Sequence, residues 1–381
     1  MPHLEVKGLH KQFAGKPPTT AIDQLEFSIE EGELVVLLGP SGCGKTTTLR
    51  CLAGLETADA GQISLGGRTW FDSSQRIALP PEKRNIGMVF QSYALWPHMT
   101  VRKNIGYPLR SRRKKGPEAA QWIEEAAALV NVEALLDRYP AQLSGGQQQR
   151  VSLARSLVSR PDMILFDEPL SNLDAKLRDD VRAQLHELHG RLGFTAVFVT
   201  HDQSEALALA DRVAVMRAGR FEQIGDPFEV FERPATEYVA DFLGLSNRLP
   251  AERVDGGVRV AGAEVVGDVL APTDLGDFVL RIRPEDLHAA PTRADLRGLT
   301  TLPATVVDAV YGGRHVDLYL SVAELRIHAR VDGSSVEWAR SLTAGRGVVV
   351  GFDPENAKAY GTAEGSRLLD GRRLATARNG A

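Results

Sequence analysis

Eight residues near the N-terminus restrict the possible folds of this chain more than any other feature. They follow the pattern G-x-x-x-x-G-K-[ST] and read Gly39-Pro40-Ser41-Gly42-Cys43-Gly44-Lys45-Thr46. The apolar run 33–38 precedes them and the helix-like segment 47–53 follows them. A strand, a glycine loop and a helix in this order form a phosphate site, because the loop N–H groups and the helix N-terminus favour negative charge. We therefore expect a nucleoside triphosphate here, with Lys45 neutralising the β- and γ-phosphates and the Thr46 hydroxyl reaching Mg²⁺.

Length and composition limit the class of protein. At 381 residues the chain is too long for one ordinary core, which favours two domains. A hydrophobic share of 43% and a charged share of 25% are ordinary for a soluble globular protein, and a net charge of -4 argues against a general nucleic-acid binder. The N-terminus lacks the layout of a signal peptide, and no apolar run approaches the roughly 18 residues of a membrane helix. Work at a membrane would therefore need partners that span it.

Both cysteines of the chain, Cys43 and Cys51, lie in or just after the glycine loop. A disulfide between them would distort the loop, so we expect reduced thiols in a cytosolic compartment. Their expected role is that of small residues packed near the loop.

Residues 1–240 mix strand and helix patterns in a way that predicts an α/β fold. Pro117 opens an Ala-rich helix over 118–130. Short continuous apolar runs are typical of central strands in a parallel sheet that is covered on both faces, and we expect right-handed crossovers between them. Besides 33–38, the segments that read as strands are 4–9, 25–29, 61–67, 163–166 and 195–199.

The pattern changes after about Leu245, where helical periodicity fades and short glycine-punctuated strands take over. Strands at this spacing predict an all-β, barrel-like domain over 245–364. The polar, Arg-rich stretch 365–381 has no core pattern, and we expect it to be poorly ordered. The strands expected in this domain are 257–260, 277–282, 316–320, 325–328 and 347–350.

Two further elements carry the residue types that phosphate chemistry needs. In Leu143-Ser144-Gly145-Gly146-Gln147 a hydroxyl and two glycine N–H groups precede a helix, whose positive end would face an anion. The apolar run 163–166 ends at Asp167, which is followed by Glu168. Because neighbouring side chains alternate along a strand, Asp167 can hold Mg²⁺ through water while Glu168 acts as general base on the attacking water.

The order of these motifs resembles the ABC-type ATPase family over residues 1 to about 240, and the pentapeptide 143–147 matches the family's signature. The run 169–174 resembles the D-loop, which crosses to the opposite subunit. His201 matches the switch histidine that contacts the γ-phosphate, and Gln91 matches the Q-loop glutamine, whose loop reaches the membrane partner. Phe13 lies where the family places an aromatic ring that stacks on adenine.

The resemblance implies a complete nucleotide site. Glu168, His201 and Gln91 would be catalytic, and Thr46, Gln91 and Asp167 would hold Mg²⁺. It implies a P-loop core with a parallel sheet, an antiparallel β subdomain and a helical subdomain over about 92–160. It also implies a two-fold homodimer, in which each ATP lies between the phosphate loop of one copy and the signature of the other, so that ATP closes the dimer and hydrolysis opens it. The residues that would contact ATP are Phe13, Gly39, Pro40, Ser41, Gly42, Cys43, Gly44, Lys45, Thr46, Thr47, Ser144, Gly145, Gly146 and Gln147.

The appended β domain favours an importer ATPase. Its segments 281–287 and 304–313, with the join 233–244, resemble the oligosaccharide-binding-fold (TOBE-like) regulatory domain of sugar, polyamine, sulfate and ferric-iron importers. The long insertion 70–84 is more similar to the ferric-iron and phosphonate importers. The resemblance implies an integral membrane permease, an extracytoplasmic solute-binding protein as an indirect partner, no nucleic acid, and a peripheral place on the cytoplasmic face of the membrane.

Two alternatives stay open: the ATPase of an exporter with a separate membrane subunit, and a soluble ABC ATPase that is not involved in transport. DNA-repair and chromosome-organising members separate the two halves of the ATPase by a long coiled coil, whereas fewer than 100 residues separate Lys45 from Leu143 here. Translation-factor members carry two such domains per chain, and a metabolic kinase would lack the signature. The β domain favours the importer over the exporter.

Overall fold

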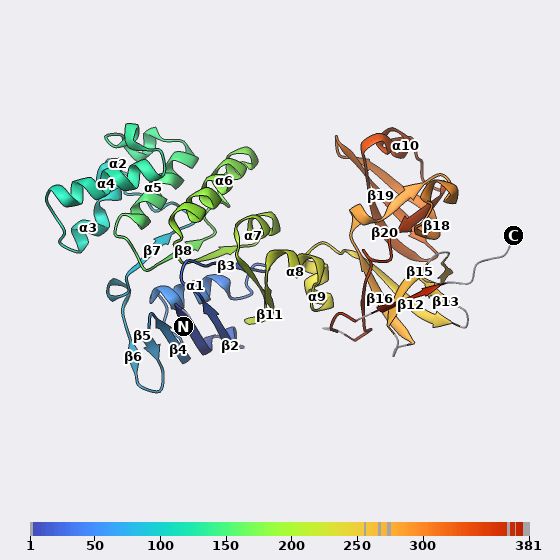
Figure 1. The fold of residues 1–381 in the computed structure, drawn as a ribbon, viewed down its shortest axis with the longest axis horizontal. Coiled ribbons are helices and arrows are strands. Elements are labelled where there is room, and N and C mark those ends of the chain that lie inside the picture. The colour runs from blue at the N-terminus through green and yellow to red at the C-terminus, as the bar shows by residue number, and fades with distance from the viewer. Residues whose placement is uncertain are drawn as a thin grey trace. The chain divides into compact units, whose positions relative to one another are not determined.

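A computed structural model describes residues 3–254, 257–265, 268–272, 276–363, 366–369 and 371–375 of the chain. The chain divides into two units, 1–228 and 229–381. This division lies earlier in the chain than the expected boundary at 240–245, and the helix α8 (Pro227–Glu232) spans it. The fold class predicted from the sequence, an α/β ATPase core followed by an all-β domain, is confirmed (Figure 1).

The core of the first unit is a six-stranded sheet in the order β11-β10-β3-β9-β8-β7. Its pairings are parallel except for the edge pair β10–β11. Strands β3 and β9 are buried along their whole length, as expected for continuous apolar runs covered on both faces. The bounds are β3 (Leu34–Leu38), β7 (Ile86–Val89), β8 (Met163–Asp167), β9 (Ala196–Thr200), β10 (Arg212–Arg217) and β11 (Arg220–Gly225).

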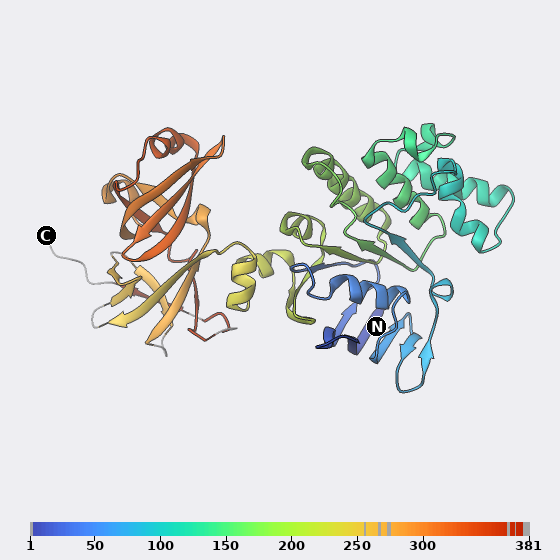
Figure 2. The ribbon, with the colours of Figure 1, turned by 180° about the vertical axis from the view of Figure 1, so that it is seen from behind.

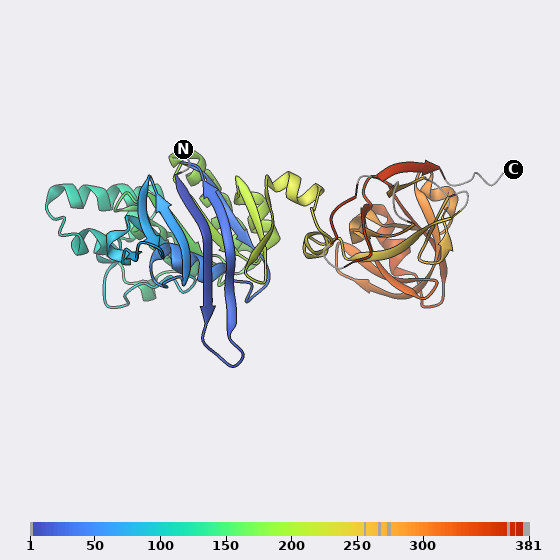
Figure 3. The same ribbon diagram turned by 90° about the horizontal axis from the view of Figure 1, so that it is seen from below.

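A second, antiparallel sheet has the order β2-β1-β4-β5-β6. The helix α1 (Lys45–Ala53) lies between the two sheets, and its Leu49 and Leu52 share one hydrophobic core with residues of both (Figures 1 and 2). Strands β1 and β2 run side by side into a long hairpin (Figure 3). The bounds are β1 (Leu4–Phe13), β2 (Thr19–Ile29), β4 (Ala60–Leu65), β5 (Arg68–Asp72) and β6 (Ile77–Ala78).

Helices gather at one end of the core sheet and form the expected helical subdomain (Figure 1). Asn104 is fully buried there, and its amide donates to the carbonyls of Trp96, Met99 and Thr100, which fixes the turn that precedes the helices. Thr100 caps the first helix by accepting a hydrogen bond from the Lys103 N–H. The helices of this subdomain are α2 (Val101–Ile105), α3 (Tyr107–Ser111), α4 (Pro117–Leu129) and α5 (Gly145–Leu157), and the first unit also contains α6 (Ala175–Leu192) and α7 (Gln203–Leu209).

The second unit consists of antiparallel strands around its own hydrophobic core, which confirms the predicted all-β domain. Its helix α9 (Glu237–Phe242) is tied to the sheet by Arg281, which lies 3.0 Å from a Glu237 carboxylate oxygen and 2.7 Å from an Asp241 oxygen. Arg281 and Glu237 are both largely buried, and removing one partner of a buried pair typically costs about 3–5 kcal/mol. The remaining elements are β12 (Asn247–Val254), β13 (Gly257–Val260), β14 (Ala263–Glu264), β15 (Asp268–Pro272), β16 (Asp277–Ile282), β17 (His288–Ala290), β18 (Thr300–Tyr311), β19 (His315–Val322), β20 (Leu325–Asp332), α10 (Val336–Arg340), β21 (Gly347–Phe352), β22 (Lys358–Tyr360) and β23 (Gly371–Ala375).

The stretch 365–381, which the sequence predicts to be poorly ordered, includes β23. This strand pairs antiparallel with β15 over residues 268–272. Residues 366–369 are also described, and Leu368 forms an isolated bridge with Tyr360. The rest of the stretch lies outside the described residues.

Candidate active site

The glycine loop joins β3 to α1 and encloses a cradle that only glycine can build. Gly44 has a φ of 110°, and a Cβ on it would lie 2.1 Å from the Ala21 carbonyl oxygen. A Cβ on Gly39 would lie 2.6 Å from the Met216 carbonyl oxygen. The Lys45 side chain is buried, and its Nζ donates to the carbonyl oxygens of Gly39 at 2.7 Å and Pro40 at 3.0 Å. The loop therefore holds an ammonium group on its inner side, where phosphate oxygens can replace the carbonyls as partners.

Two oxygen-bearing side chains meet beside the loop. The Thr46 hydroxyl, in the first turn of α1, donates to Asp167 Oδ1 at the end of β8, at 3.2 Å. Burial raises the pKa of Asp167, while the Thr46 hydrogen bond opposes that rise. A hydroxyl and a carboxylate fit Mg²⁺, which keeps several water and phosphate ligands and needs few from the protein. That donor set explains why, over the part of the chain that the structure describes, no three His, Cys, Asp or Glu side chains cluster as a metal site.

Glu168 and His201 form the polar pair of the site. His201 Nδ1 lies 3.3 Å from Glu168 Oε2. Glu168 has a φ of 45°, a conformation that costs a non-glycine residue free energy and is often found at functional sites. Its backbone is held on both sides, because its N–H donates to the Val199 carbonyl at 3.1 Å and its own carbonyl accepts from the Ser171 hydroxyl at 2.9 Å. The strained turn thus aims the carboxylate away from β8 toward His201.

Gln91 is joined to the run 169–174 by two hydrogen bonds. Its Nε2 donates to Ser171 Oγ at 3.1 Å, and its carbonyl accepts from Asn172 Nδ2 at 2.8 Å. Because Ser171 also bonds the Glu168 carbonyl, one hydroxyl links the backbone of Glu168 to the side chain of Gln91. The structure therefore brings Gln91 and Glu168 into one network.

The signature segment begins α5. Ser144 Oγ accepts from the Gln147 N–H at 3.4 Å, and Gln147 Oε1 accepts from the Ser144 N–H at 3.0 Å, which makes a reciprocal capping box. A Cβ on Gly146 would lie 2.6 Å from Leu177 Cδ1 on α6, so the start of α5 packs closely on this leucine, which would have to shift if a side chain were added at residue 146. Within the described ranges, no hydrogen bond or ion pair joins this segment to residues 39–47. The signature and the phosphate loop of one chain are thus not directly joined.

Phe13 ends β1, and the residue is 40% exposed, with the Lys11 Nζ 5.2 Å from the ring centroid. It pairs with Thr19 of β2. Ala21, two residues further along β2, packs against Gly44 of the loop. The exposed Phe13 ring therefore lies on the same hairpin as Ala21, the residue that contacts the phosphate loop.

Sequence reasoning missed several residues that hold the site in place. Thr200 donates to Glu205 at 2.6 Å and accepts from the Asp202 N–H at 3.0 Å, which fixes the turn that carries His201. Burial raises the pKa of Glu205. The sequence signal was available, since Asp202 precedes a helical pattern and caps α7 through the Ser204 and Glu205 N–H groups. The bond between Ser171 and Gln91 had no comparable signal, because the two residues are distant in the chain.

A parallel sheet with a phosphate loop after β3, and an acid pair at the end of β8 with β9 between the two strands, defines a P-loop ATPase. The family described as ABC transporter matches residues 22–171, and the family described as TOBE domain matches residues 280–358. The sulfate/thiosulfate import ATP-binding protein CysA 2 of Chromobacterium violaceum is 48% identical over 318 residues, which cover 84% of each chain. The chain belongs to the ABC transporter family, as one of its ATP-binding subunits.

Other relatives agree with this assignment. The sn-glycerol-3-phosphate import ATP-binding protein UgpC of Jannaschia sp. is 41% identical over 340 residues, which cover 89% of this chain and 94% of that protein. The spermidine/putrescine import ATP-binding protein PotA of Nitratidesulfovibrio vulgaris is 43% identical over 332 residues, covering 85% and 87%. Among solved structures, the ATP-binding cassette MJ0796, in a dimeric post-hydrolysis state bound to ADP and Pi, superposes with a TM-score of 0.51 and 30% identity, covering 59% of this chain and 98% of that chain.

These comparisons confirm the predicted ABC-type ATPase, its binding of ATP and its TOBE domain. The described helices include none with the length and apolar character needed to cross a membrane.

Proposed function

We propose that this chain is the ATP-hydrolysing subunit of an importer, and that it works as a homodimer on a separate membrane permease at the cytoplasmic face of the membrane. The observation that carries the hydrolytic part is the edge of the core sheet, where Thr46 and Asp167 lie 3.2 Å apart and Glu168 and His201 lie 3.3 Å apart. The importer part is supported by relatives named as import ATP-binding proteins, at 41–48% identity over most of the chain.

Each residue of the site has a role that follows from its position. Lys45 exchanges its two carbonyl partners for β- and γ-phosphate oxygens. Thr46, Asp167 and Gln91 would hold Mg²⁺, which when bound neutralises charge on the phosphates. Glu168 accepts a proton from the attacking water, and His201 beside it contacts the γ-phosphate.

The proposed homodimer is supported by the position of the signature at the start of α5. The N-terminus of α5 presents the backbone of residues 144–147, which suits an anion. In the proposed homodimer, this end of α5 meets the γ-phosphate held by the loop of the partner copy. The dimeric state of the ATP-binding cassette MJ0796 supports this arrangement.

The solute is chosen by other components of the transporter, so the ATPase subunit carries little information on it. The relatives' names include sulfate or thiosulfate, sn-glycerol 3-phosphate and polyamines. The insertion 70–84 includes the end of β5, all of β6 and the turn between them, in which Asp72 accepts from the Ser74 N–H at 2.8 Å. On the resemblance of this insertion we keep ferric iron or a phosphonate as the proposed solute, delivered by an extracytoplasmic solute-binding protein.

Capture of partners tests this function. The Glu168→Gln protein, expected to stay closed on ATP, is used as bait on detergent-solubilised native membranes with ATP, and with ADP as the matched control. Recovery of a multi-span permease with ATP supports transport, and an accompanying solute-binding protein supports import and names the solute through its own pocket. Recovery of soluble partners alone would overturn the transport proposal and leave the ATPase.

A further inference from the structure

Arg155, on the helix that begins with the signature, is buried and makes hydrogen bonds to the loop that carries Gln91. Its guanidinium donates to the carbonyl oxygens of Ala94 and, at 2.8 Å, of Tyr93. It also lies over the Trp96 ring, with 5.2 Å between Cζ and the ring centroid. Burial lowers the pKa of Arg155 to about 10, so the group stays charged at neutral pH. A buried charge is retained only where its partners are well placed, and here the partners are the carbonyls two and three residues after Gln91.

Those two carbonyls belong to residues in an unusual conformation. Tyr93 has a φ of 59° and Ala94 a φ of 48°, although neither is glycine. Left-handed backbone at such residues costs free energy and persists where the surroundings compensate for it. The bonds from Arg155 provide that compensation and hold both carbonyls turned toward α5.

The other end of this segment, at Gln91, is held by hydrogen bonds to the run 169–174. Asn172 donates to the Gln91 carbonyl, and Gln91 donates to the Ser171 hydroxyl. The short segment 91–94 is therefore clamped between α5 on one side and the run 169–174 on the other.

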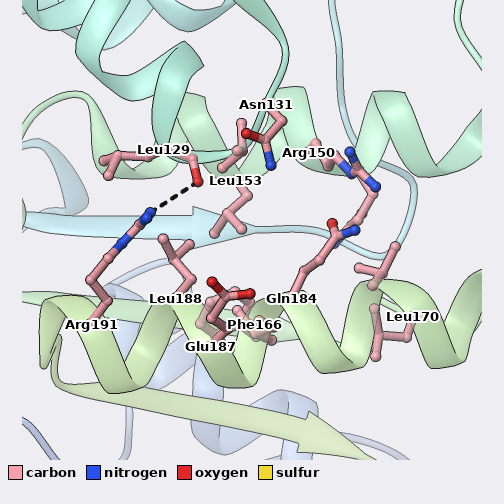
Figure 4. A pocket seen from close by; sticks show the side chains of 14 residues that line it. Leu129, Asn131, Arg150, Leu153, Phe166, Leu170, Gln184, Glu187, Leu188 and Arg191 are labelled. Atoms are coloured by element: carbon pink, nitrogen blue, oxygen red, sulfur yellow. Dashed lines mark hydrogen bonds between the residues drawn. The ribbon is translucent and has the colours of Figure 1, made fainter.

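The opposite face of α5 borders a cavity along the middle of the helix. The cavity, of about 80 Å³, lies between α5 and α6, although Gly146 at the start of α5 packs closely on Leu177 of α6 (Figure 4). The cavity is lined by Leu153, Phe166 and Leu188, and across it Arg191 donates to the Leu129 carbonyl at 3.4 Å. Gln149 Oε1 and Arg150 Nε, on the same helix, are buried without a hydrogen-bond partner. Missing contacts and unsatisfied polar atoms lower the resistance of α5 to a small displacement against α6.

We infer that Arg155 is a positioning residue that couples the signature helix to Gln91. A displacement of α5 carries Arg155 with it and moves the Tyr93 and Ala94 carbonyls, which sets where Gln91 points. Engagement of the signature by the partner's nucleotide is thereby transmitted to the residue that contacts the metal and the attacking water. This inference rests on the proposed role of Gln91 in ATP hydrolysis.

Arg84 provides a matched control for the burial of an arginine. Its guanidinium donates to the carbonyls of Cys51 and Leu52, each at 2.7 Å, and lies 5.4 Å from the Trp70 ring centroid. Burial lowers its pKa to about 10 as well. It bonds the end of α1 and not the segment 91–94, so Arg84→Met reports the cost of losing a buried arginine by itself.

The test is a double-mutant cycle in the full chain with Gln91→Ala. Arg155→Met should lower kcat by about tenfold, with KM for ATP changed less than about twofold, and should lower it little further once Gln91 is already alanine. Arg84→Met should lower the melting temperature about as much as Arg155→Met does. Any effect of Arg84→Met on kcat should add to the effect of Gln91→Ala. Full additivity of Arg155→Met with Gln91→Ala, or an unchanged kcat in folded Arg155→Met, would overturn the inference. If Arg155→Met does not fold, the same cycle is read with Arg155→Lys, which keeps the charge but loses the planar fork.

A second measurement separates this inference from the proposed function. Amide hydrogen exchange over residues 91–96 should speed up in Arg155→Met and stay unchanged in Arg84→Met. Absence of ATP hydrolysis by the unmodified protein, alone and with its permease, would refute the proposed function, yet faster exchange would still show that Arg155 holds the segment. Unchanged exchange over 91–96 would overturn the inference whatever the activity.

Discussion

His201 Nδ1 lies 3.3 Å from Glu168 Oε2, at the carboxyl edge of two adjacent parallel strands. The carboxylate is the enclosed member of this pair, with 22% of the Glu168 side chain exposed against 55% for His201. Ligands of open parallel sheets bind at this edge, in line with the glycine loop that follows β3. A proton acceptor and a hydrogen-bonding ring thus stand together where the γ-phosphate of a nucleotide on the loop would lie.

Replacing Glu168 by glutamine should separate binding from hydrolysis. The amide keeps the size of the side chain but cannot accept the proton of water, so kcat should fall by about 10²–10⁴-fold. ATP affinity should be unchanged, because Lys45 and the loop are untouched, and ATP should accumulate a dimer. Phosphate release and size-exclusion chromatography measure both effects, with ADP as the control that leaves the protein monomeric. Turnover at the rate of the unmodified protein would refute the role of Glu168 as base.

Replacing Lys45 by alanine should weaken ATP binding. The ammonium group is buried against the loop carbonyls and becomes a charged partner of the phosphates, and one such hydrogen bond contributes about 1.5–3 kcal/mol. We expect the dissociation constant for ATP to rise by about tenfold to a hundredfold in a nucleotide titration. Lys358→Ala is the matched control, since Lys358 Nζ also donates to a backbone carbonyl, that of Glu355 at 2.8 Å, in the second unit. Equal affinity loss in both variants would argue against a direct contact of Lys45 with phosphate.

Asp167→Asn should stabilise the nucleotide-free protein while abolishing its activity. Burial raises the pKa of Asp167, so ionised Asp167 destabilises the folded state at neutral pH, and its contribution to stability improves as pH falls through the raised pKa. The asparagine variant lacks that charge. Its melting temperature should exceed that of the unmodified protein at pH 7, and the difference should shrink as the pH falls into the acid range. A difference that grows on acidification would contradict the assigned direction of the pKa shift.

The elements that the sequence predicted best are those with local signals. The runs around residues 33–38, 163–166 and 195–199 became β3, β8 and β9, because continuous apolar segments beside glycine and acidic residues suit a buried parallel sheet. The loop 39–46 was predictable for the same reason, since its pattern and its flanks are contiguous.

Contacts between distant segments were not predictable from patterns. Nothing near Ser171 in the chain indicates that its hydroxyl would join the Glu168 carbonyl to the Gln91 amide. Arg155 likewise reads as an ordinary polar residue of an amphipathic helix, and only the packing of α5 on the segment 91–96 shows that it is buried. The roles proposed for Gln91 and Glu168 remain predictions that the substitutions above test, and the role proposed for His201 also remains a prediction.

The division of the chain between residues 228 and 229 predicts where it can be cut. The first unit has a hydrophobic core of its own, shared by its two sheets and α1. A chain of residues 1–228 should therefore fold cooperatively and bind ATP. Loss of a cooperative transition in thermal or denaturant unfolding would show that the core needs the rest of the chain.

A fragment that ends at Leu245, where the sequence pattern changes, should aggregate more readily than a fragment that ends at Phe228. Ala240 and Leu245 are buried against Tyr360, and Glu237 on α9 bonds Arg281, so the longer fragment would expose an apolar surface and an unpaired carboxylate. We expect 1–245 to bind ATP as 1–228 does, because the site is the same, but to aggregate more readily by light scattering. Removing the unpaired charge with Glu237→Gln should not reduce the aggregation of 1–245, since the exposed apolar residues remain. If 1–245 proves the more soluble fragment, α9 belongs with the ATPase unit and the boundary lies near 245 after all.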